Sequence, residues 1–133
     1  MNINQLLDLI TNARPLQLPK GWEYGEDKDF TITLNKRDLS CAILRLPYGD
    51  HGIGFVTKRS DAPVSTSTVV CLDAKELIGD KEQYSVEDAK IILDHFANGF
   101  TNNAFSRRVY KAVRILVDRI YAELLANETN PPL

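Results

Sequence analysis

Asp50 and His51 come nearest to an acid–base pair in this sequence. They follow Tyr48 in the turn-rich segment 47–52, and histidine titrates close to neutral pH, so a proton could be moved there. Adjacent side chains on a strand usually point to opposite faces, however, so the spacing alone does not let Asp50 orient His51. We favour the alternative, a polar hairpin tip in which Asp and Gly serve the turn geometry.

The remaining titratable groups form no recognisable catalytic or metal-binding set. His95 flanks the apolar stripe of a predicted helix, and its neighbour Asp94 does not face it there. Glu87 and Asp88 suit the positive end of that helix, so a solvated acidic face explains them better than a metal ion does. The chain also lacks a glycine-rich phosphate loop, a nucleophile elbow and a zinc-protease motif. We therefore expect no enzyme activity, no metal and no cofactor.

The two cysteines, Cys41 and Cys71, each lie in an apolar run typical of a strand. There is no Cys-x-x-Cys motif and no Cys/His cluster with zinc spacing. Free cysteine is often buried as a small hydrophobic residue. We predict two reduced, buried thiols in a cytoplasmic protein.

The segment 105–124 carries the most information about binding. At helical spacing its apolar residues fall on one side: Phe105, Val109, Ala112, Val113, Leu116, Val117, Ile120 and Leu124. Tyr110 and Tyr121 widen this arc beyond the roughly 100° that a helix packed on one side needs. Either the helix is wedged between the sheet and other helices, or a partner or second copy buries the arc around Tyr110, Val117 and Tyr121.

The opposite side of the same helix is basic. It carries one acid, Asp118, and five cations: Arg107, Arg108, Lys111, Arg114 and Arg119. The planar guanidinium suits bidentate contacts with carboxylates or phosphates. The basic side is either solvated and balanced by the acidic segment 73–94, or it binds an acidic protein or a nucleic acid. The candidate partner-binding residues are these five with Tyr110, Val117 and Tyr121.

A smaller basic feature comes from two predicted loops. Lys58 and Arg59 are expected in one loop and Lys36 and Arg37 in the preceding hairpin. If both loops lie at the same end of the sheet, they form a second basic rim.

The first half of the chain predicts a helix followed by strands. Asn2 is a suitable N-cap for an amphipathic helix that ends near residue 12 or 13, because Pro15 disfavours helical backbone before it. Strands are predicted at 22–24, 29–35, 39–46, 53–57 and 66–72, with a polar turn at 25–28. The short loops between them make these strands antiparallel neighbours.

Beyond residue 72 the hydrophobic period becomes helical. Asp73 with Glu76 caps a short helix, and Ser85 with Asp88 opens a second one over 86–98. Gly99 is predicted in the left-handed conformation that often ends a helix. The last helix should reach about Asn127, with 128–133 as a flexible tail.

These elements predict one α+β domain over residues 1–133. A short N-terminal helix precedes an antiparallel meander of four to five strands, and a C-terminal helical hairpin packs on one face. The 133 residues are 44% hydrophobic and 26% charged, which is ordinary for a globular protein and excludes a disordered chain. The net charge of −2 provides no overall attraction to DNA or to a membrane surface. No apolar run is long enough for a membrane span, and no secretory signal is expected at residues 1–10.

We therefore expect a small cytoplasmic protein-binding module that acts through its C-terminal helix. Inhibitors, immunity proteins, adaptors and secretion chaperones have this size and balance, and the partner would be another protein or a second copy. The first alternative is a nucleic-acid-binding accessory protein that uses the basic side of the same helix. The second is a small-ligand binder or enzyme with a site between sheet and helices, near Trp22, Tyr48 and His51.

Overall fold

The computed structural model describes residues 1–18, 20–27, 30–36, 39–47, 49–99 and 106–129. Its strands are β1 (Glu23–Asp27), β2 (Phe30–Lys36), β3 (Leu39–Leu46), β4 (Gly52–Arg59) and β5 (Thr68–Asp73). Its helices are α1 (Ile3–Asn12), α2 (Ala74–Ile78), α3 (Val86–Asn98) and α4 (Ser106–Thr129), with one 3₁₀ turn, η1 (Val64–Thr66). The strands form one sheet in the order β1-β2-β3-β4-β5, and every neighbouring pair is antiparallel. The predicted α+β class is confirmed: the strands of an antiparallel sheet follow an N-terminal helix in the sequence and precede C-terminal helices.

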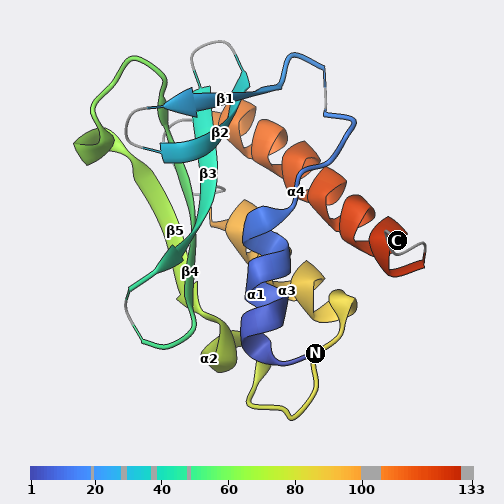
Figure 1. Ribbon diagram of the computed structural model, residues 1–133. Coiled ribbons are helices and arrows are strands. Elements are labelled where there is room, and N and C mark those ends of the chain that lie inside the picture. Colours follow the sequence, from blue (N-terminus) through green and yellow to red (C-terminus); the bar gives the residue numbers. More distant parts are fainter. Residues whose placement is uncertain (19, 28–29, 37–38, 48, 100–105, 130–133) are drawn as a thin grey trace.

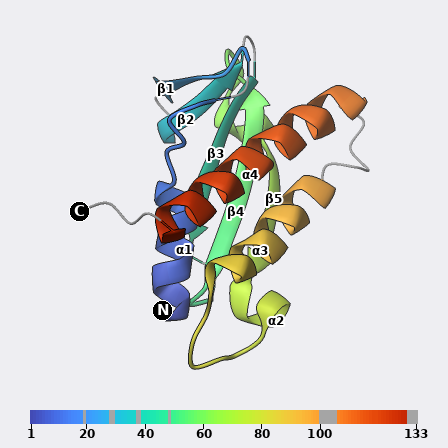
Figure 2. The ribbon, with the colours of Figure 1, turned by 90° about the vertical axis from the view of Figure 1, so that its right-hand side faces the viewer.

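Helices α1, α3 and α4 all lie on one face of the sheet (Figures 1 and 2). The core fills the space between these two layers. The sheet contributes Cys41, Ile53 and Phe55 to it, and the ring of Phe55 lies 5.8 Å from the ring of Phe96 on α3, centroid to centroid. The helices are held at these positions mainly by burial of their apolar stripes, because a ten-residue helix such as α1 is marginal alone.

Local capping sets the starts of three helices as predicted. The Asn2 Oδ1 accepts the Gln5 N–H at 2.8 Å, and the Gln5 Oε1 accepts the Asn2 N–H at 2.8 Å. Ser85 and Asp88 form the same reciprocal capping box at α3. At α2 the Asp73 Oδ1 accepts the Lys75 N–H at 2.9 Å. These bonds satisfy N–H groups that have no partner inside the helix.

The end of α3 differs from the prediction. Gly99 has φ −63° and ψ −18°, which is right-handed helical backbone, so the predicted left-handed conformation is wrong. A Cβ at this position would lie only 2.6 Å from both methyl carbons of Val70 on β5. Glycine is needed here because the end of α3 lies too close to Val70 for a side chain to fit, and not because the backbone angles of Gly99 require it.

Cys41 and Cys71 are both free, but only Cys41 is buried. Burial in the core raises the pKa of the Cys41 thiol far above its ordinary value, so this thiol stays protonated and inert. Cys71 is exposed, so the prediction that both thiols are buried is wrong for Cys71. In β5 the side chains alternate between the two faces, and Cys71 lies on the face away from the helices.

Several predicted boundaries also shift. Strand β1 continues through Gly25–Asp27, where a turn was predicted, and its register breaks between Gly25 and Asp27. Strand β5 starts only at Thr68, because 64–66 form the 3₁₀ turn. Helix α4 extends through Thr129, so the predicted tail is helical at 128–129, and 130–133 lie outside the described residues.

Lys58 and Arg59 belong to β4 and not to a loop. Lys58 is 5% exposed, and its ammonium group donates to the backbone carbonyls of Ala62 at 3.0 Å and Ser60 at 3.3 Å. Lys58 therefore stabilises the turn after β4, and the predicted second basic rim is wrong for this residue. The side chains of the other predicted hairpin, at 36–37, lie outside the described ones.

The sheet face away from the helices is apolar at its centre. Ala42 and Val56 pack together there, 4% and 5% exposed, with the partly buried Leu44 against them. Leu46 covers the position beside Gly54, where a Cβ would meet its Cδ1 at 2.9 Å. Helices α1, α3 and α4 all lie on the other face of the sheet (Figure 1). Strands β3 to β5 are thus apolar on both faces, although helices cover only one.

Candidate partner-binding site on helix α4

The apolar arc of α4 belongs to the core of the single chain. Its buried members are Ala112, Val113, Leu116, Val117, Ile120 and Leu124. Val117, which we expected at a partner surface, is 0% exposed, so its side chain contacts only its own chain. Tyr110 and Tyr121 are partly buried and pack against the same core. The arc is wide because α4 contacts both α1 and α3 and lies over the sheet, so its apolar residues enter the common core (Figure 2).

The basic side of α4 is partly neutralised within the fold. One Nη of Arg114 donates to an Asp94 carboxylate oxygen on α3 at 2.7 Å and to Asp118 at 2.6 Å. Lys90 donates to the other oxygen of Asp94 at 2.7 Å. Burial alone would raise the pKa of Asp94, but the hydrogen bonds and charges of Lys90 and Arg114 outweigh it and hold that pKa below its ordinary value. Arg114 therefore links α3 to α4, and its charge is paired with Asp94 and Asp118 within the chain.

Replacing Arg114 by methionine should lower the free energy of unfolding by about 1 kcal/mol near neutral pH, because two charge-assisted hydrogen bonds are lost. A lowered native pKa means that Asp94 adds stability above its unfolded pKa of about 3.9, and that this stability is lost as the pH falls through the native value. The difference in free energy of unfolding between the wild type and Arg114→Met should therefore become smaller from about pH 7 to about pH 3. Urea denaturation at both pH values measures it.

The matched control is Arg119→Met on the same helix. Arg119 is exposed and makes no ion pair within the described part of the chain, so its loss should change stability by less than about 0.5 kcal/mol at either pH. An Arg114→Met loss of equal size at both pH values would show that packing of the Arg114 stem, and not its charge, links the helices.

The cations that remain accessible frame an apolar residue. Lys111 and Arg119 are exposed, and Ile115 lies midway between them, four residues from each, with 50% of its side chain exposed. Ala122 and Ala126 continue the same side of the helix and are also exposed. We call these five residues the α4 outer stripe. The helix includes Arg107 and Arg108, but their side chains lie outside the described ones.

Ile115 is not among the predicted partner-binding residues. It lies on the basic side of α4, outside the apolar arc, and single surface hydrophobic residues are common. The signal was its i±4 spacing from Lys111 and Arg119, which places all three in one line along the helix. Arg114 is partly buried and paired with Asp94 and Asp118, and Val117 is fully buried. Lys111 and Arg119 are therefore the exposed residues among the described side chains of the predicted site.

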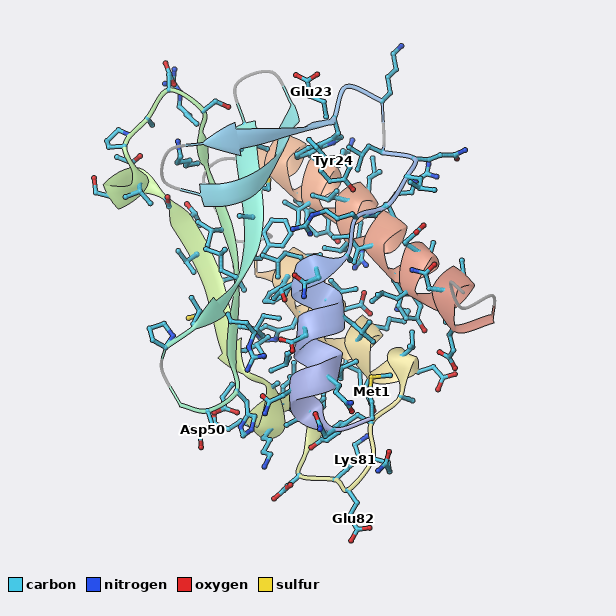
Figure 3. The ribbon with its side chains drawn as sticks, viewed as in Figure 1. Met1, Glu23, Tyr24, Asp50, Lys81 and Glu82 are labelled. Carbon is cyan, nitrogen blue, oxygen red and sulfur yellow. The ribbon has the colours of Figure 1, made fainter. Side chains whose placement is uncertain are left out.

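The side chains of Asp50 and His51 do not form a hydrogen-bonded acid–base pair within the described residues. Asp50 lies at the tip of the β3–β4 connection and points away from the core (Figure 3). The His51 carbonyl accepts the Ala74 N–H at 3.0 Å, which continues the β4–β5 ladder, and no hydrogen bond joins the two side chains in the described structure. Tyr48 lies outside the described residues, and Trp22 is buried in the core.

A cavity of about 30 Å³ lies near Tyr24, between α1 and β3, and Ile120 also lines it. This volume holds a water molecule or two, whereas sites for small organic ligands have roughly 300 Å³ or more. The polar groups at its rim are occupied: the Tyr24 hydroxyl donates to the Pro15 carbonyl at 2.8 Å, and Arg14 donates to the Thr11 and Ala13 carbonyls. Burial raises the pKa of Tyr24. The cavity gives no support to a small-ligand site.

The described residues contain neither a metal-binding cluster nor a membrane-spanning helix. No group of three or more His, Cys, Asp and Glu side chains there is placed to hold a metal ion. None of the described helices combines the length and apolar character needed to cross a membrane. Comparison of the chain with protein-family models, with curated proteins and with solved structures found no match.

Proposed function

We propose that this protein is a protein-binding module and that it recognises an acidic partner surface through the α4 outer stripe. The observation that carries the proposal is Ile115, half exposed with an exposed cation one turn to either side. Protein interfaces characteristically bury an apolar centre within a polar or charged rim. Lys111 and Arg119 are available for such a rim because neither forms an ion pair within the described structure.

The small side chains of the stripe favour a partner helix, or another partner element whose backbone can lie close to α4. Beyond Arg119 the outer side of α4 presents Ala122 and Ala126, which let a second backbone approach closely. An acidic partner segment would pair with the two cations while an apolar side chain packs on Ile115. A module of this kind fits an inhibitor, immunity protein, adaptor or secretion chaperone, and its two free thiols fit the reducing cytoplasm.

The proposal is tested by affinity capture from native lysate with four single variants. Ile115→Glu and Arg119→Glu alter the stripe. Leu16→Glu and Lys20→Glu are the corresponding changes, an apolar residue to Glu and a cation to Glu, on the connector after α1. Leu16 is 91% exposed and Lys20 is also exposed, so none of the four changes should disturb the core. We expect one or more acidic proteins to be retained by the wild type and both connector variants, and lost from both stripe variants.

Nuclease treatment and salt separate this outcome from the nucleic-acid alternative. A protein partner stays bound after nuclease treatment, whereas binding through phosphates disappears with the nucleic acid and falls steeply as salt rises. Material lost with nuclease would replace our proposal by that alternative. Retention that is equal for the stripe and connector variants would overturn it outright.

A further inference from the structure

The two edges of the sheet are protected very differently. Edge strand β1 has three acids among its five residues, and its register breaks between Gly25 and Asp27. Acidic side chains and irregular pairing both discourage another strand from adding to an edge. The opposite edge, β5, pairs with β4 in unbroken register, and its residues 68–72 include no charged residue and no proline.

The backbone of β5 is arranged to accept another strand. The Ala74 N–H donates to the His51 carbonyl at 3.0 Å, which fixes the phase of the β4–β5 ladder. Because hydrogen-bonded and non-hydrogen-bonded pairs alternate in an antiparallel ladder, Thr68 and Val70 direct their peptide groups at β4. Val69 and Cys71 therefore direct their N–H and C=O groups outward, and no described residue bonds to them there.

The side chains of these two residues are also apolar and accessible. Val69 is 47% exposed and Cys71 is exposed, on the sheet face that carries the Ala42–Val56 cluster. A strand added at this edge would extend that apolar face instead of interrupting it. Figure 1 shows β5 at the border of the sheet, on the side opposite to β1.

We propose that β5 pairs antiparallel with β5 of a second copy, so that two sheets join into one continuous sheet across a twofold axis. With the axis at Val70, the outward peptide groups of Val69 bond to those of Cys71 of the partner subunit, and the reverse pair follows by symmetry. All four side chains of these pairs are apolar and lie on the same face. This surface is separate from the α4 outer stripe, so the inference does not depend on the proposed function.

A second copy is the occupant that the strand itself specifies. Within residues 68–72 self-pairing brings no like charges together, and the β-branched residues favour extended backbone. Asp73 ends the edge, because its carboxylate caps α2. A six-residue strand is about 20 Å long, so the contact is small and the dimer should be weak and dependent on concentration.

The decisive experiment compares two double variants that differ in the sign of one charge. Val69→Lys/Cys71→Lys places lysine opposite lysine twice across the axis, whereas Val69→Lys/Cys71→Glu places lysine opposite glutamate twice. Both positions are exposed, so both variants should fold, which circular dichroism checks. Sedimentation velocity under reducing conditions, from micromolar to submillimolar protein, measures self-association.

We expect the wild type and the Lys/Glu variant to associate, and the Lys/Lys variant to show a dissociation constant at least about tenfold higher. Val64→Lys is the matched control, because Val64 is also a valine with 47% exposure but lies on η1, outside β5. It should associate like the wild type. A wild type that stays monomeric throughout, or equal association of the two double variants, would overturn the proposal.

A cross-link identifies the pairing itself. Directly opposed residues have the Cα separation that a disulfide needs, so mild oxidation of Val69→Cys should link it to Cys71 of the partner subunit and give a covalent dimer. Val64→Cys, treated identically, should give no more dimer than the wild type. If both variants cross-link equally, the copies meet by another surface and the β5 pairing is wrong.

Discussion

Replacing Phe96 by alanine is expected to destabilise the protein by about 3–5 kcal/mol, the largest effect of any single change that we predict. Phe96 is 0% exposed, and its ring contacts the ring of Phe55 across the interface between α3 and the sheet. The change removes this apolar burial and leaves a cavity at the centre of the core. A small domain has only about 5–15 kcal/mol of stability in total, so a measurable unfolded population should appear.

Urea denaturation, monitored by circular dichroism, measures this loss. The slope of the free energy of unfolding against urea concentration should be the same as in the wild type, which checks two-state behaviour. The control is His95→Ala, one residue earlier on the same helix, where the side chain is exposed. That change should alter stability by less than about 0.5 kcal/mol. A Phe96→Ala variant within about 1 kcal/mol of the wild type would contradict the packing of α3 on the sheet described above.

Substituting Gly99 by alanine should destabilise the protein by about 1–3 kcal/mol, the usual range for overpacking. The backbone angles of Gly99 are ones that alanine adopts readily, and by that criterion alone alanine would stabilise by about 0.4–1 kcal/mol. The added methyl group, however, would lie 2.6 Å from both methyl carbons of Val70, and a β-branched side chain has little freedom to move away. Backbone preference and the steric clash therefore change the free energy of unfolding in opposite directions, and thermal or urea denaturation decides between them.

Removing the obstacle tests the cause of that loss. In a Val70→Ala background the clash disappears, so Gly99→Ala should there be neutral or stabilising. The cycle of four proteins isolates the coupling between residues 70 and 99. A Gly99→Ala variant as stable as the wild type would mean that α3 ends farther from β5 than the structure shows.

Features set by neighbours in sequence were predicted well. The capping residues Asn2, Asp73 and Ser85 act on N–H groups only two or three positions away, so their role follows from local spacing. The bounds of β3 follow from a run that is apolar except at Ser40 and Arg45, which indicates a strand at the centre of the sheet. These signals do not depend on where the rest of the chain lies.

Features set by distant contacts were not predictable in the same way. Gly99 is constrained by Val70, and Arg114 is neutralised by Asp94, and both partners come from other elements of the chain. Helical spacing correctly placed Val117 on the apolar side of α4, but periodicity cannot say whether its own chain or a partner covers that side. For the same reason, only the packing of α4 in the fold shows that the residues around Ile115 are the exposed part of the candidate site.

The strand order has a consequence for synthesis of the protein. Each strand pairs with its neighbour in sequence, so the sheet closes only short loops and can assemble one hairpin at a time as the chain leaves the ribosome. Helix α4, by contrast, is C-terminal to all five strands and completes the helical layer over the sheet. Until α4 has left the ribosome, the apolar face of the nascent sheet stays partly exposed to water, and at that stage the uncharged β5 edge is most open to aggregation.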